Sequence, residues 1–465
     1  MKLKNIFTAI ALTVAGTLPA VLWAKPGDPL TFKAIDQRTY VQLSVPAQLD
    51  PQPVFECRSG ESGEWRPYSP AAALYVNAGE TVSIRAATNG VQSLVGGISQ
   101  YGVLYEPRWS CSFLTLEGRM EASGDVTTLL SRQGVSEVPD YAFHYLFRNC
   151  KNIVTAPDLP AGKLGKYCCR EMFSGCEALT NAPVLAATEL GEGCYLCMFC
   201  ACSGLTAAPA LPARKLAASC YYMMFSSCTA LETPPTLPAT ELAESCYRYM
   251  FQGCTSLKSA PALPATELAE SCYSTMFCNC VKLTAAPVLP ATELAKSCYG
   301  GMFSGCRELT DAPVLPATKL AESCYGSMFF GCRALTTAPV LPATTMEKSC
   351  YSDMFKDCSG LLEAPSLPAK TLHVSCYAWM FSGCTSLTRA PDLPSVRVQW
   401  ECYAGMFSGC TGLTDAPFLP ASDLFNAEAC YASMFSGCTS LTNVTLMAKN
   451  EKPAFWSDYF ANWLS

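Results

Sequence analysis

Cysteine is the residue type with the most capacity for chemistry in this sequence. The 465-residue chain contains 29 cysteines but only two histidines, His144 and His373. Twenty-three of the cysteines fall in two columns of a repeated motif, SCYxxMFSGC, and the two columns stand eight residues apart. The second column contains Cys150, Cys176, Cys202, Cys228, Cys254, Cys280, Cys306, Cys332, Cys358, Cys384, Cys410 and Cys438. Thiols at such regular spacing can form disulfides, bind a metal ion or fill a hydrophobic core.

One segment, CYLCMFCAC, concentrates four thiols at Cys194, Cys197, Cys200 and Cys202. A closed metal site needs ligands that converge in a tetrahedral arrangement. On a helix with about 100° per residue, Cys197 and Cys200 point away from the side that carries the other two. The four sulfur atoms therefore do not converge, and the sequence predicts no metal site and no other bound cofactor.

We interpret the cysteines of the two columns as buried thiols. Their eight-residue spacing puts both columns on one side of a helix, where Cys acts as a small hydrophobic residue. The alternative is a ladder of disulfides, which export to an oxidising compartment would favour. Against the ladder, Ala142 occupies the place where Cys150 would find a partner within its repeat. Neighbouring cysteines of one column would also have parallel Cβ vectors, which is a poor geometry for a bond.

No pattern in the sequence predicts catalysis. The chain lacks a nucleophile elbow, an HExxH motif and a phosphate-binding loop. His144 stands between Phe143 and Tyr145, and His373 has no acid and nucleophile near it in the sequence. The net charge of −6 argues against a nucleic-acid partner. We therefore expect a protein that is not an enzyme and does not bind nucleic acid.

The elements that carry these residues repeat with a fixed period. Ten of the eleven intervals between Cys150 and Cys438 are 26 residues long, and the last is 28 because of an insertion around Leu424 to Ala427. A constant period of this length is typical of a solenoid, in which each unit buries its apolar face against its neighbours. The repeats therefore predict a solenoid of short helices and short parallel strands.

Within each repeat, CYxxMFSGC predicts a short helix. Its Cys, Tyr, Met, Phe and Cys fall within an arc of about 140°, which is the width of a core-facing stripe. The two positions after the Tyr then face outward, and the Gly after the Phe ends the helix. The segment LTxAP predicts a very short strand that proline terminates. Side by side, these strands would form a continuous narrow parallel sheet.

Two further columns lie in the rest of the repeat. A recurring glutamate, interpreted as part of a solvated face, stands at Glu189, Glu241, Glu267 and Glu293. A valine recurs between two prolines at Val288, Val314 and Val340. The valines either form an exposed apolar ridge for a partner or point inward, and the sequence leaves both alternatives open.

Residues 1–24 have the pattern of an export signal. Lys2 and Lys4 precede an apolar run that begins at Ile6, and Ala20 and Ala24 are suitable cleavage positions. An uncleaved membrane anchor is the alternative, but Thr, Gly and Pro residues dilute the run. No other stretch could span a membrane. We therefore expect an exported protein, which is secreted, periplasmic or attached to the cell surface.

The sequence divides the rest of the chain into four parts. Alternating segments such as TYVQLSV in residues 25–122 predict a small β-sandwich. Its two cysteines, Cys57 and Cys111, either pair in a disulfide or remain free. Residues 123–149 predict a cap made of a degraded repeat, residues 150–447 the solenoid, and residues 448–465 a C-terminal cap.

The repeat LTxAPxLP followed by CYxxMFxGC resembles the leucine-rich-repeat surface proteins of the BspA-like group. The segments PLTFKA and AGETVSIRA are similar to the N-terminal domain of many such proteins, and LTNVTLMA with SDYFANWLS is similar to their closing cap. The resemblance implies a leucine-rich-repeat solenoid and recognition at the cell surface, such as adhesion to host proteins, matrix or other cells. Proline within the strand segment departs from the leucine-rich-repeat consensus, so the resemblance does not imply which face binds.

These observations favour a binding protein that uses its solenoid to recognise a protein or glycan. The alternative is a structural spacer that presents an N-terminal β domain as the binding head. Aromatic residues are enriched at recognition hot spots, and Tyr222, Tyr249 and Trp379 occupy outward positions of the repeat. We therefore predict a binding patch of Tyr222, Arg248 and Tyr249, with Trp379 as a further contact. The sequence does not indicate an oligomeric state.

Overall fold

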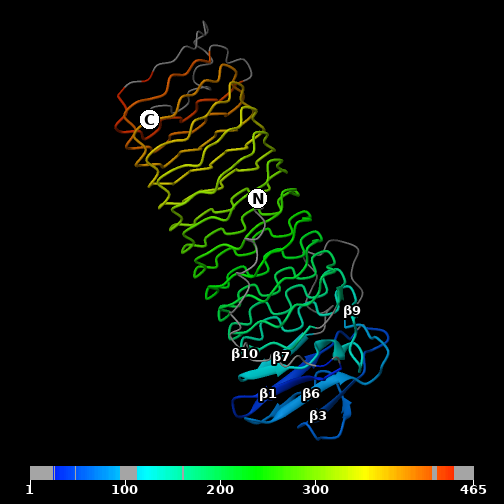
Figure 1. Cartoon of the computed structure of the whole chain (residues 1–465). Helices are drawn as coiled ribbons and strands as arrows, with labels where there is room; N and C mark the ends of the chain where they lie inside the picture. The colour runs from blue at the N-terminus through cyan, green and yellow to red at the C-terminus, as the bar shows by residue number, and fades with distance from the viewer. Residues whose placement is uncertain are drawn as a thin grey trace, which may run out of the picture.

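The computed structural model shows a long solenoid that begins at a pair of small β-sheets (Figure 1). It describes residues 25, 27–47, 49–94, 113–159, 162–421, 427–442 and 444. Several expected features lie outside the described residues. They are the export signal, Cys111, most of the insertion in the 28-residue interval and the C-terminal cap.

The N-terminal region consists of two sheets. The larger sheet has the strand order β10-β8-β1-β6-β3-β4, and the smaller has the order β5-β2-β7. Their strands are β1 (Leu30–Ala34), β2 (Thr39–Ser44), β3 (Phe55–Ser59), β4 (Arg66–Tyr68), β5 (Leu74–Val76), β6 (Thr81–Ala86), β7 (Phe113–Glu117), β8 (Met120–Ser123) and β10 (Ile153–Thr155). Further short elements are the 3-10 helix η2 (Val126–Leu129), β9 (Glu137–Val138) and β11 (Lys163–Leu164). The expected strand-rich region is confirmed.

Alternation of apolar and polar residues explains why these segments form strands. In β1, Leu30, Phe32 and Ala34 are buried, while the residues between them are partly or fully exposed. Successive side chains of a strand point to opposite faces of the sheet, so this alternation buries one face and leaves the other in solvent. The buried side chains of both sheets belong to one hydrophobic core, which continues into the solenoid.

The N-terminal sheets close the open end of the solenoid. Strand β8 pairs in parallel with β10, which lies in the first full repeat. The backbone amide of Leu114 in β7 also donates to the carbonyl of Leu146, at 2.6 Å. The rings of Phe32 and Phe147 lie 6.3 Å apart across the same junction. Because β10 is a strand of the larger sheet, the two parts of the chain share both a core and a hydrogen-bonded edge.

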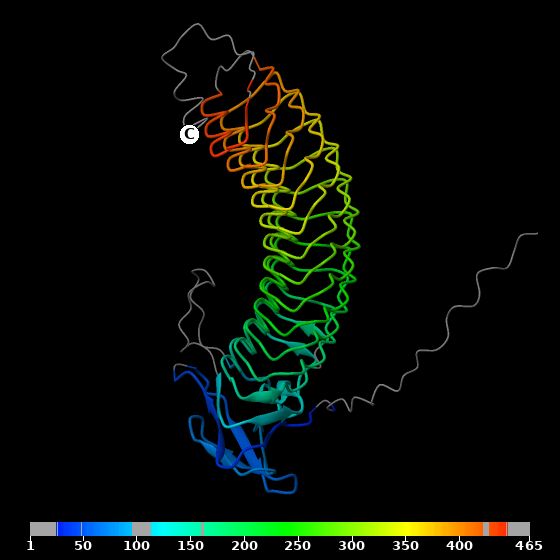
Figure 2. The same cartoon turned by 90° about the vertical axis from the view of Figure 1, so that its left-hand side faces the viewer.

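The expected helix of the repeat is wrong, since the described residues of the solenoid contain no α-helix. In the repeat around Cys246, Ser245, Tyr249 and Gly253 have φ angles of 54°, 58° and 72°. Every fourth residue is therefore in the left-handed region. The backbone makes consecutive turns and the stack of turns curves gently along its length (Figure 2).

The hydrogen bonds explain why a helix does not form. The amide of Met250 donates to the carbonyl of Tyr247 within the turn, at 3.1 Å. The amide of Tyr247 donates instead to Cys272 of the next repeat, at 3.0 Å. This alternation continues through the segment, so every second amide bonds to the neighbouring turn. An α-helix would use all of these amides internally, whereas a run of β-turns leaves half of them free to connect the stack.

The other side of each repeat forms isolated bridges in place of a continuous sheet. Ser259 bridges Ala285 in parallel, and Ala285 bridges Asp311. A second column includes the bridge from Glu267 to Glu293. Proline has no amide hydrogen to donate, so the prolines of APxLP interrupt the ladder after one residue. The expected parallel direction is correct, but the expected sheet is wrong.

The core of the solenoid consists of side chains stacked on their own copies. Consecutive phenylalanines of one column, such as Phe277 and Phe303, lie 5.7 Å apart with nearly parallel rings. The tyrosine column has the same arrangement, with Tyr273 and Tyr299 at 5.9 Å. Aromatic pairs at such spacing stabilise each other beyond the burial of their area. The stack therefore favours the same residue type at the same place in neighbouring turns.

Candidate functional site

Four variable positions of each repeat lie together on one surface, which we call the turn face. It is formed by the two positions after the Tyr and the two positions after the Phe of each CYxxMFxxC segment. In the repeat around Cys246 these are Arg248, Tyr249, Gln252 and Gly253, and all four are partly exposed. The intervening Cys, Tyr, Met, Phe and Cys residues are fully buried. The turn face is therefore where the sequence can vary without disturbing the stack.

The predicted patch of Tyr222, Arg248 and Tyr249 comes together on the turn face. The rings of Tyr222 and Tyr249 lie edge to face, with their centroids 5.7 Å apart and their planes at 71°. The guanidinium carbon of Arg248 lies 5.0 Å from the centroid of the Tyr249 ring. Both tyrosines are partly buried, and burial raises the pKa of Tyr222. The three residues form one aromatic and cationic cluster.

Arg248 keeps hydrogen-bonding capacity that the described part of the chain does not use. Its Nε is buried and has no partner among the described residues. Its Nη2 makes only a long contact of 3.5 Å to the Tyr249 hydroxyl. None of the ion pairs found among the described residues includes Arg248. The described residues therefore leave donors of this guanidinium group without a partner.

Trp379 belongs to a separate cluster on the turn face. Its ring covers Gly405 so closely that a Cβ at that position would lie 2.3 Å from the Trp379 Cε3. The Nζ of Lys356 lies 5.2 Å from the Trp379 ring and 5.9 Å from the Phe330 ring. Asp353 holds this ammonium group at 3.2 Å. The structure does not bring Trp379 together with the tyrosines.

The turns between the two clusters have small outward side chains. Their outward positions are occupied by Gly300, Gly301 and Gly326 together with small polar residues. Phe330 and Lys356 were not predicted as site residues. Both stand at the position after the Phe, where Ser is the commonest residue, so a departure from the repeat consensus was the available signal.

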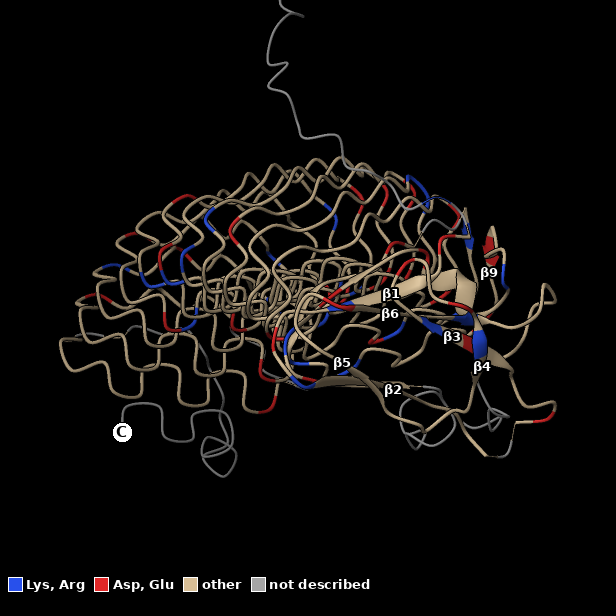
Figure 3. Cartoon of the chain, turned by 90° about the horizontal axis from the view of Figure 1, so that it is seen from below, with Lys and Arg blue, Asp and Glu red and all other residues tan. Residues whose placement is uncertain are grey.

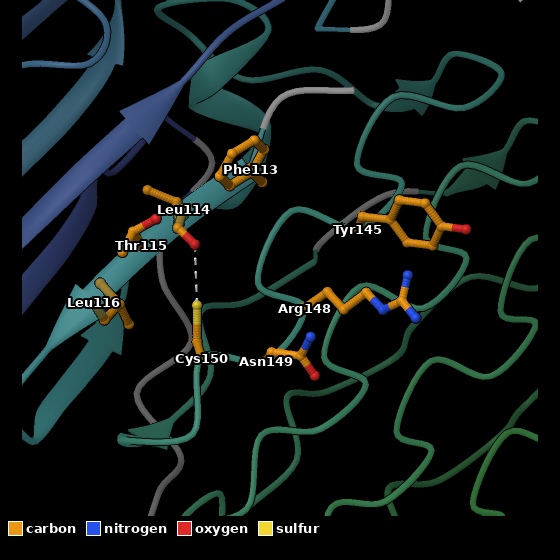
Figure 4. A pocket seen from close by; sticks show the side chains of 8 residues that line it. All are labelled: Phe113, Leu114, Thr115, Leu116, Tyr145, Arg148, Asn149 and Cys150. Carbon is orange, nitrogen blue, oxygen red and sulfur yellow. Dashed lines mark hydrogen bonds between the residues drawn. The ribbon is translucent and has the colours of Figure 1, made fainter. Parts of the chain in front are cut away.

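A cavity of about 230 Å³ lies between β7 and the first turns of the solenoid (Figure 4). It is lined by Phe113, Leu114, Thr115, Leu116, Tyr145, Arg148, Asn149 and Cys150. The thiol of Cys150 donates to the carbonyl of Leu114 at 3.3 Å, and burial raises the pKa of Cys150 to about 12. The guanidinium group of Arg148 lies 4.7 Å above the Tyr145 ring. Sequence reasoning missed this cavity because it depends on contacts between distant segments.

Neither histidine forms part of a catalytic arrangement that the described residues support. His144 is 4% exposed, and burial together with the charges of Arg170 and Arg148 lowers its pKa to about 3. It is therefore neutral at physiological pH and in contact with the Tyr145 ring, at 3.9 Å between centroids. The Nδ1 of His373 accepts the amide of Val374, at 2.9 Å.

The column cysteines, except the partly exposed Cys438, lie in the core as buried thiols. Most thiols of the second column donate to the carbonyl of a phenylalanine in the preceding repeat, as Cys254 does to Phe225 at 3.1 Å. Cys194 and Cys202 are buried in the same way, whereas Cys197 and Cys200 lie half-buried on the turn face. No group of three or more metal-ligating side chains occurs in the described part of the chain. Cys57 is buried in β3, and its pairing with Cys111 stays a prediction because Cys111 is not among the described residues.

The two columns outside the turns differ in character. Val288, Val314 and Val340 point outward and are between 78% and 79% exposed, which settles the alternative that the sequence left open. The glutamate column is mixed, because Lys215 lies in it and pairs with Glu241 at 3.1 Å. Acidic and basic residues are both scattered along the solenoid (Figure 3).

Comparison with known proteins identifies the repeat. A family model described as a BspA type leucine rich repeat region matches six copies over residues 214–362 and 348–462. No curated protein matches the chain. A solved structure, the crystal structure of a TLR13–ssRNA13 complex, matches with 13% identity and a TM-score of 0.21. The match covers 69% of this chain and 49% of that one, so the chain spans about half the length of the matched chain. At this TM-score the match carries no argument about a ligand. Among the described residues, no helix has the length and apolar character to cross a membrane.

Proposed function

The chain belongs to the family of BspA type leucine-rich repeat proteins, and from this premise we propose that it is an exported, non-enzymatic binding protein. Its ligand is a macromolecule, either a protein or a glycan, that binds to the turn face of the solenoid. Members of this family are typically surface proteins involved in binding. The observation that carries the proposal is the cluster of Tyr222, Arg248 and Tyr249 on a surface where the fold requires no large side chain.

Two properties of the cluster support a role in recognition. The turn at Gly300 and Gly301 folds with the same backbone and almost no outward side chain, so the two tyrosines are not needed for the stack. Tyrosine and arginine are enriched at interface hot spots, where they provide large contact areas and directional donors. A guanidinium group carries five such donors, and the described partners of Arg248 leave those on its two Nη atoms largely unused.

The decisive experiment screens the exported protein against arrays of host proteins and of glycans, and then tests variants against the ligand found. Substitution of both Tyr222 and Tyr249 by Ser removes the aromatic surface and leaves the buried stack unchanged. We expect binding to weaken at least tenfold, about 1.4 kcal/mol, with an unchanged melting temperature. The matched control is Thr275→Ser, because Thr275 occupies the position of Tyr249 in the next turn. Unchanged affinity in the tyrosine variant would contradict the proposed site.

A second candidate is binding at the N-terminal region, with the solenoid as a spacer. It is favoured by the cavity beside β7, where Phe113 is 38% exposed next to Arg148. Cutting the chain between the two parts would not separate these functions cleanly, because β8 pairs with β10 of the solenoid. A Phe113→Ser variant tests the cavity within the intact chain. Loss of binding in this variant, with normal binding in the tyrosine variant, would assign the ligand to the N-terminal region.

Export is part of the same proposal and rests on residues 1–24 of the sequence. The N-terminal sequence of the protein recovered from the producing cells tests it. We expect the mature chain to begin directly after Ala20 or Ala24. A protein that retains Met1 and remains inside the cell would contradict export.

A further inference from the structure

We propose that Cys197 and Cys200 form a redox-active dithiol on the turn face, which closes to a disulfide by exchange with small external disulfides. The two residues stand apart from the other cysteines in the described part of the chain. Of the 28 cysteines in the described residues, 24 are buried, and only Cys197, Cys200, Cys278 and Cys438 are partly exposed. Cys197 and Cys200 alone among these four share one turn.

The backbone places the two residues at a distance that a disulfide can span. The amide of Cys200 donates to the carbonyl of Cys197 at 3.1 Å, which closes a β-turn with Cys197 as its first residue and Cys200 as its last. The first and last Cα atoms of a β-turn lie within about 7 Å of each other. Disulfide-bonded cysteines have Cα separations of about 4.4–6.8 Å.

Other repeats show that side chains at these two positions meet. In a later turn, Asp353 and Lys356 occupy the places of Cys197 and Cys200 and form an ion pair at 3.2 Å. In the first turn, the guanidinium group of Arg148 lies 4.7 Å above the Tyr145 ring at the same two places. Convergence of these side chains is thus a property of the turn itself.

The electrostatic surroundings assign different roles to the two thiols. The side chains of Cys197 and Cys200 hydrogen-bond to each other, and this bond lowers the pKa of Cys200 while it raises the pKa of Cys197. A hydrogen bond with Ser226 and the positive charge of Arg148 lower the pKa of Cys200 further, against the effects of burial and of Glu171. Because the thiolate is the nucleophile, Cys200 is the attacking residue and Cys197 the resolving residue.

The exchange proceeds in two balanced steps. The thiolate of Cys200 attacks one sulfur of a disulfide such as oxidised glutathione, and one glutathione thiolate leaves as the Cys200 mixed disulfide forms. Cys197 then loses its proton and attacks the Cys200 sulfur, which releases the second glutathione thiolate and forms the Cys197–Cys200 bond. The protein loses two electrons and two protons, and the external disulfide becomes two thiols. Reduced glutathione reverses both steps.

The core cysteines do not compete in this reaction. Cys194 and Cys202 of the same turn are fully buried, and burial raises the pKa of both thiols. A buried neutral thiol neither reaches an external disulfide nor attacks it. The contrast between the inward and outward cysteines of one segment therefore predicts a site-selective reaction.

The experiment equilibrates the folded protein with glutathione buffers of different redox ratio, quenches with acid and alkylates the free thiols after denaturation. Mass spectrometry then reads the peptide that contains Cys197 and Cys200. We expect the oxidised peptide to lose both alkylation sites, to be lighter by two hydrogens and to carry no glutathione. The buried column cysteines remain fully alkylated in the same sample.

Cys278 is the internal control. It occupies the position of Cys200 in its own turn, but Thr275 stands in the place of Cys197. Cys278 can therefore form a mixed disulfide with glutathione but cannot resolve it. The variant Cys197→Ser should convert Cys200 to the same behaviour, with a retained glutathione and an unchanged melting temperature. The proposal is overturned if wild-type Cys197 and Cys200 stay reduced, or keep glutathione, under conditions that modify Cys278. It is equally overturned if Cys200 pairs with a core cysteine.

Discussion

The inward and outward sides of each turn carry sequences of very different kinds. Inward, the same Cys, Tyr, Met, Phe and Cys recur from turn to turn because each side chain packs on its own copy in the neighbouring turn. Outward, the same backbone accepts glycine at Gly300 and a large aromatic residue at Tyr249. The difference shows that uniformity reflects the stack, whereas outward departures from the consensus are the place to look for function.

The strongest test of this difference between inward and outward residues is to disturb the register between turns. Deletion of residues 272–297 removes one complete period and joins Ser271 to Cys298, which restores the motif. We expect this variant to fold, since each repeat contacts only its neighbours. Deletion of residues 272–284 removes half a period and places strand residues where inward side chains and bonds to the next turn are required. We expect the solenoid of this variant to unfold.

Circular dichroism and limited proteolysis of the two purified variants measure the outcome. The full-period deletion should keep the spectrum and the cooperative melt of the parent protein, and the half-period deletion should lose both. Equal behaviour of the two variants would mean that the 26-residue period is not the structural unit.

A single substitution in the core tests the inward side alone. Phe303 is fully buried between Phe277 and Phe329, so Phe303→Ala opens a cavity and removes two ring contacts. We expect a loss of about 3–5 kcal/mol in the free energy of unfolding. The matched outward variant Thr275→Ala should change it by less than about 0.5 kcal/mol. Urea unfolding of both variants measures the difference, and similar losses would refute the distinction between the two sides.

The sequence predicted burial better than it predicted the backbone. A helical period and the observed period of four both bring Cys246, Tyr247, Met250, Phe251 and Cys254 to one side, so their burial could be predicted with the wrong backbone. The left-handed conformation of Ser, Thr, Trp and Asp residues had no signal in the sequence, because such residues rarely adopt it. It is imposed by the bonds between turns 26 residues apart.

The candidate site could also be predicted only in part from the sequence. The proximity of Tyr222 and Tyr249 could be predicted because the two residues occupy neighbouring positions in consecutive turns. The sequence could not predict the cavity beside β7, since the pairing of Leu114 with Leu146 joins an N-terminal strand to the first turn. Contacts that recur with the 26-residue period can be predicted from the sequence. Contacts between the N-terminal strands and the first turn of the solenoid cannot.

The first turn departs from the repeat consensus and contains a buried histidine, so the pH dependence of stability tests this part of the stack. His144 stands where most repeats have a small outward residue, and it is buried against Tyr141 and Tyr145 beside Arg148 and Arg170. Its pKa in the folded protein is about 3, below the ordinary value of 6.5. Below pH 6.5 the unfolded chain therefore binds a proton that the folded chain does not, and stability falls as the pH falls.

We expect this single histidine to reduce the free energy of unfolding by about 2 kcal/mol between pH 6.5 and pH 5. Urea unfolding at several pH values, compared between the parent protein and His144→Gln, isolates the effect. Asp125, whose pKa is raised by burial, titrates in both proteins and cancels in the comparison. Parallel pH profiles of the two proteins would show that His144 does not titrate on unfolding.

The smallest expected effect concerns the hydroxyl groups of the tyrosine column. The hydroxyl oxygen of Tyr299 is buried and has no hydrogen-bond partner among the described residues, and the same holds for Tyr273. A buried polar group without a partner opposes folding, whereas the ring itself contributes to the stack. Tyr299→Phe retains the stacking on Tyr273 and Tyr325 and removes only the hydroxyl. We expect the free energy of unfolding to stay constant or to rise by about 1 kcal/mol, as measured by urea unfolding. Tyr299→Leu, which removes the ring, should be clearly destabilising. A loss of more than about 1 kcal/mol in Tyr299→Phe would show that the hydroxyl has a partner in solution, such as an ordered water molecule, and that the inward side depends on more than stacking.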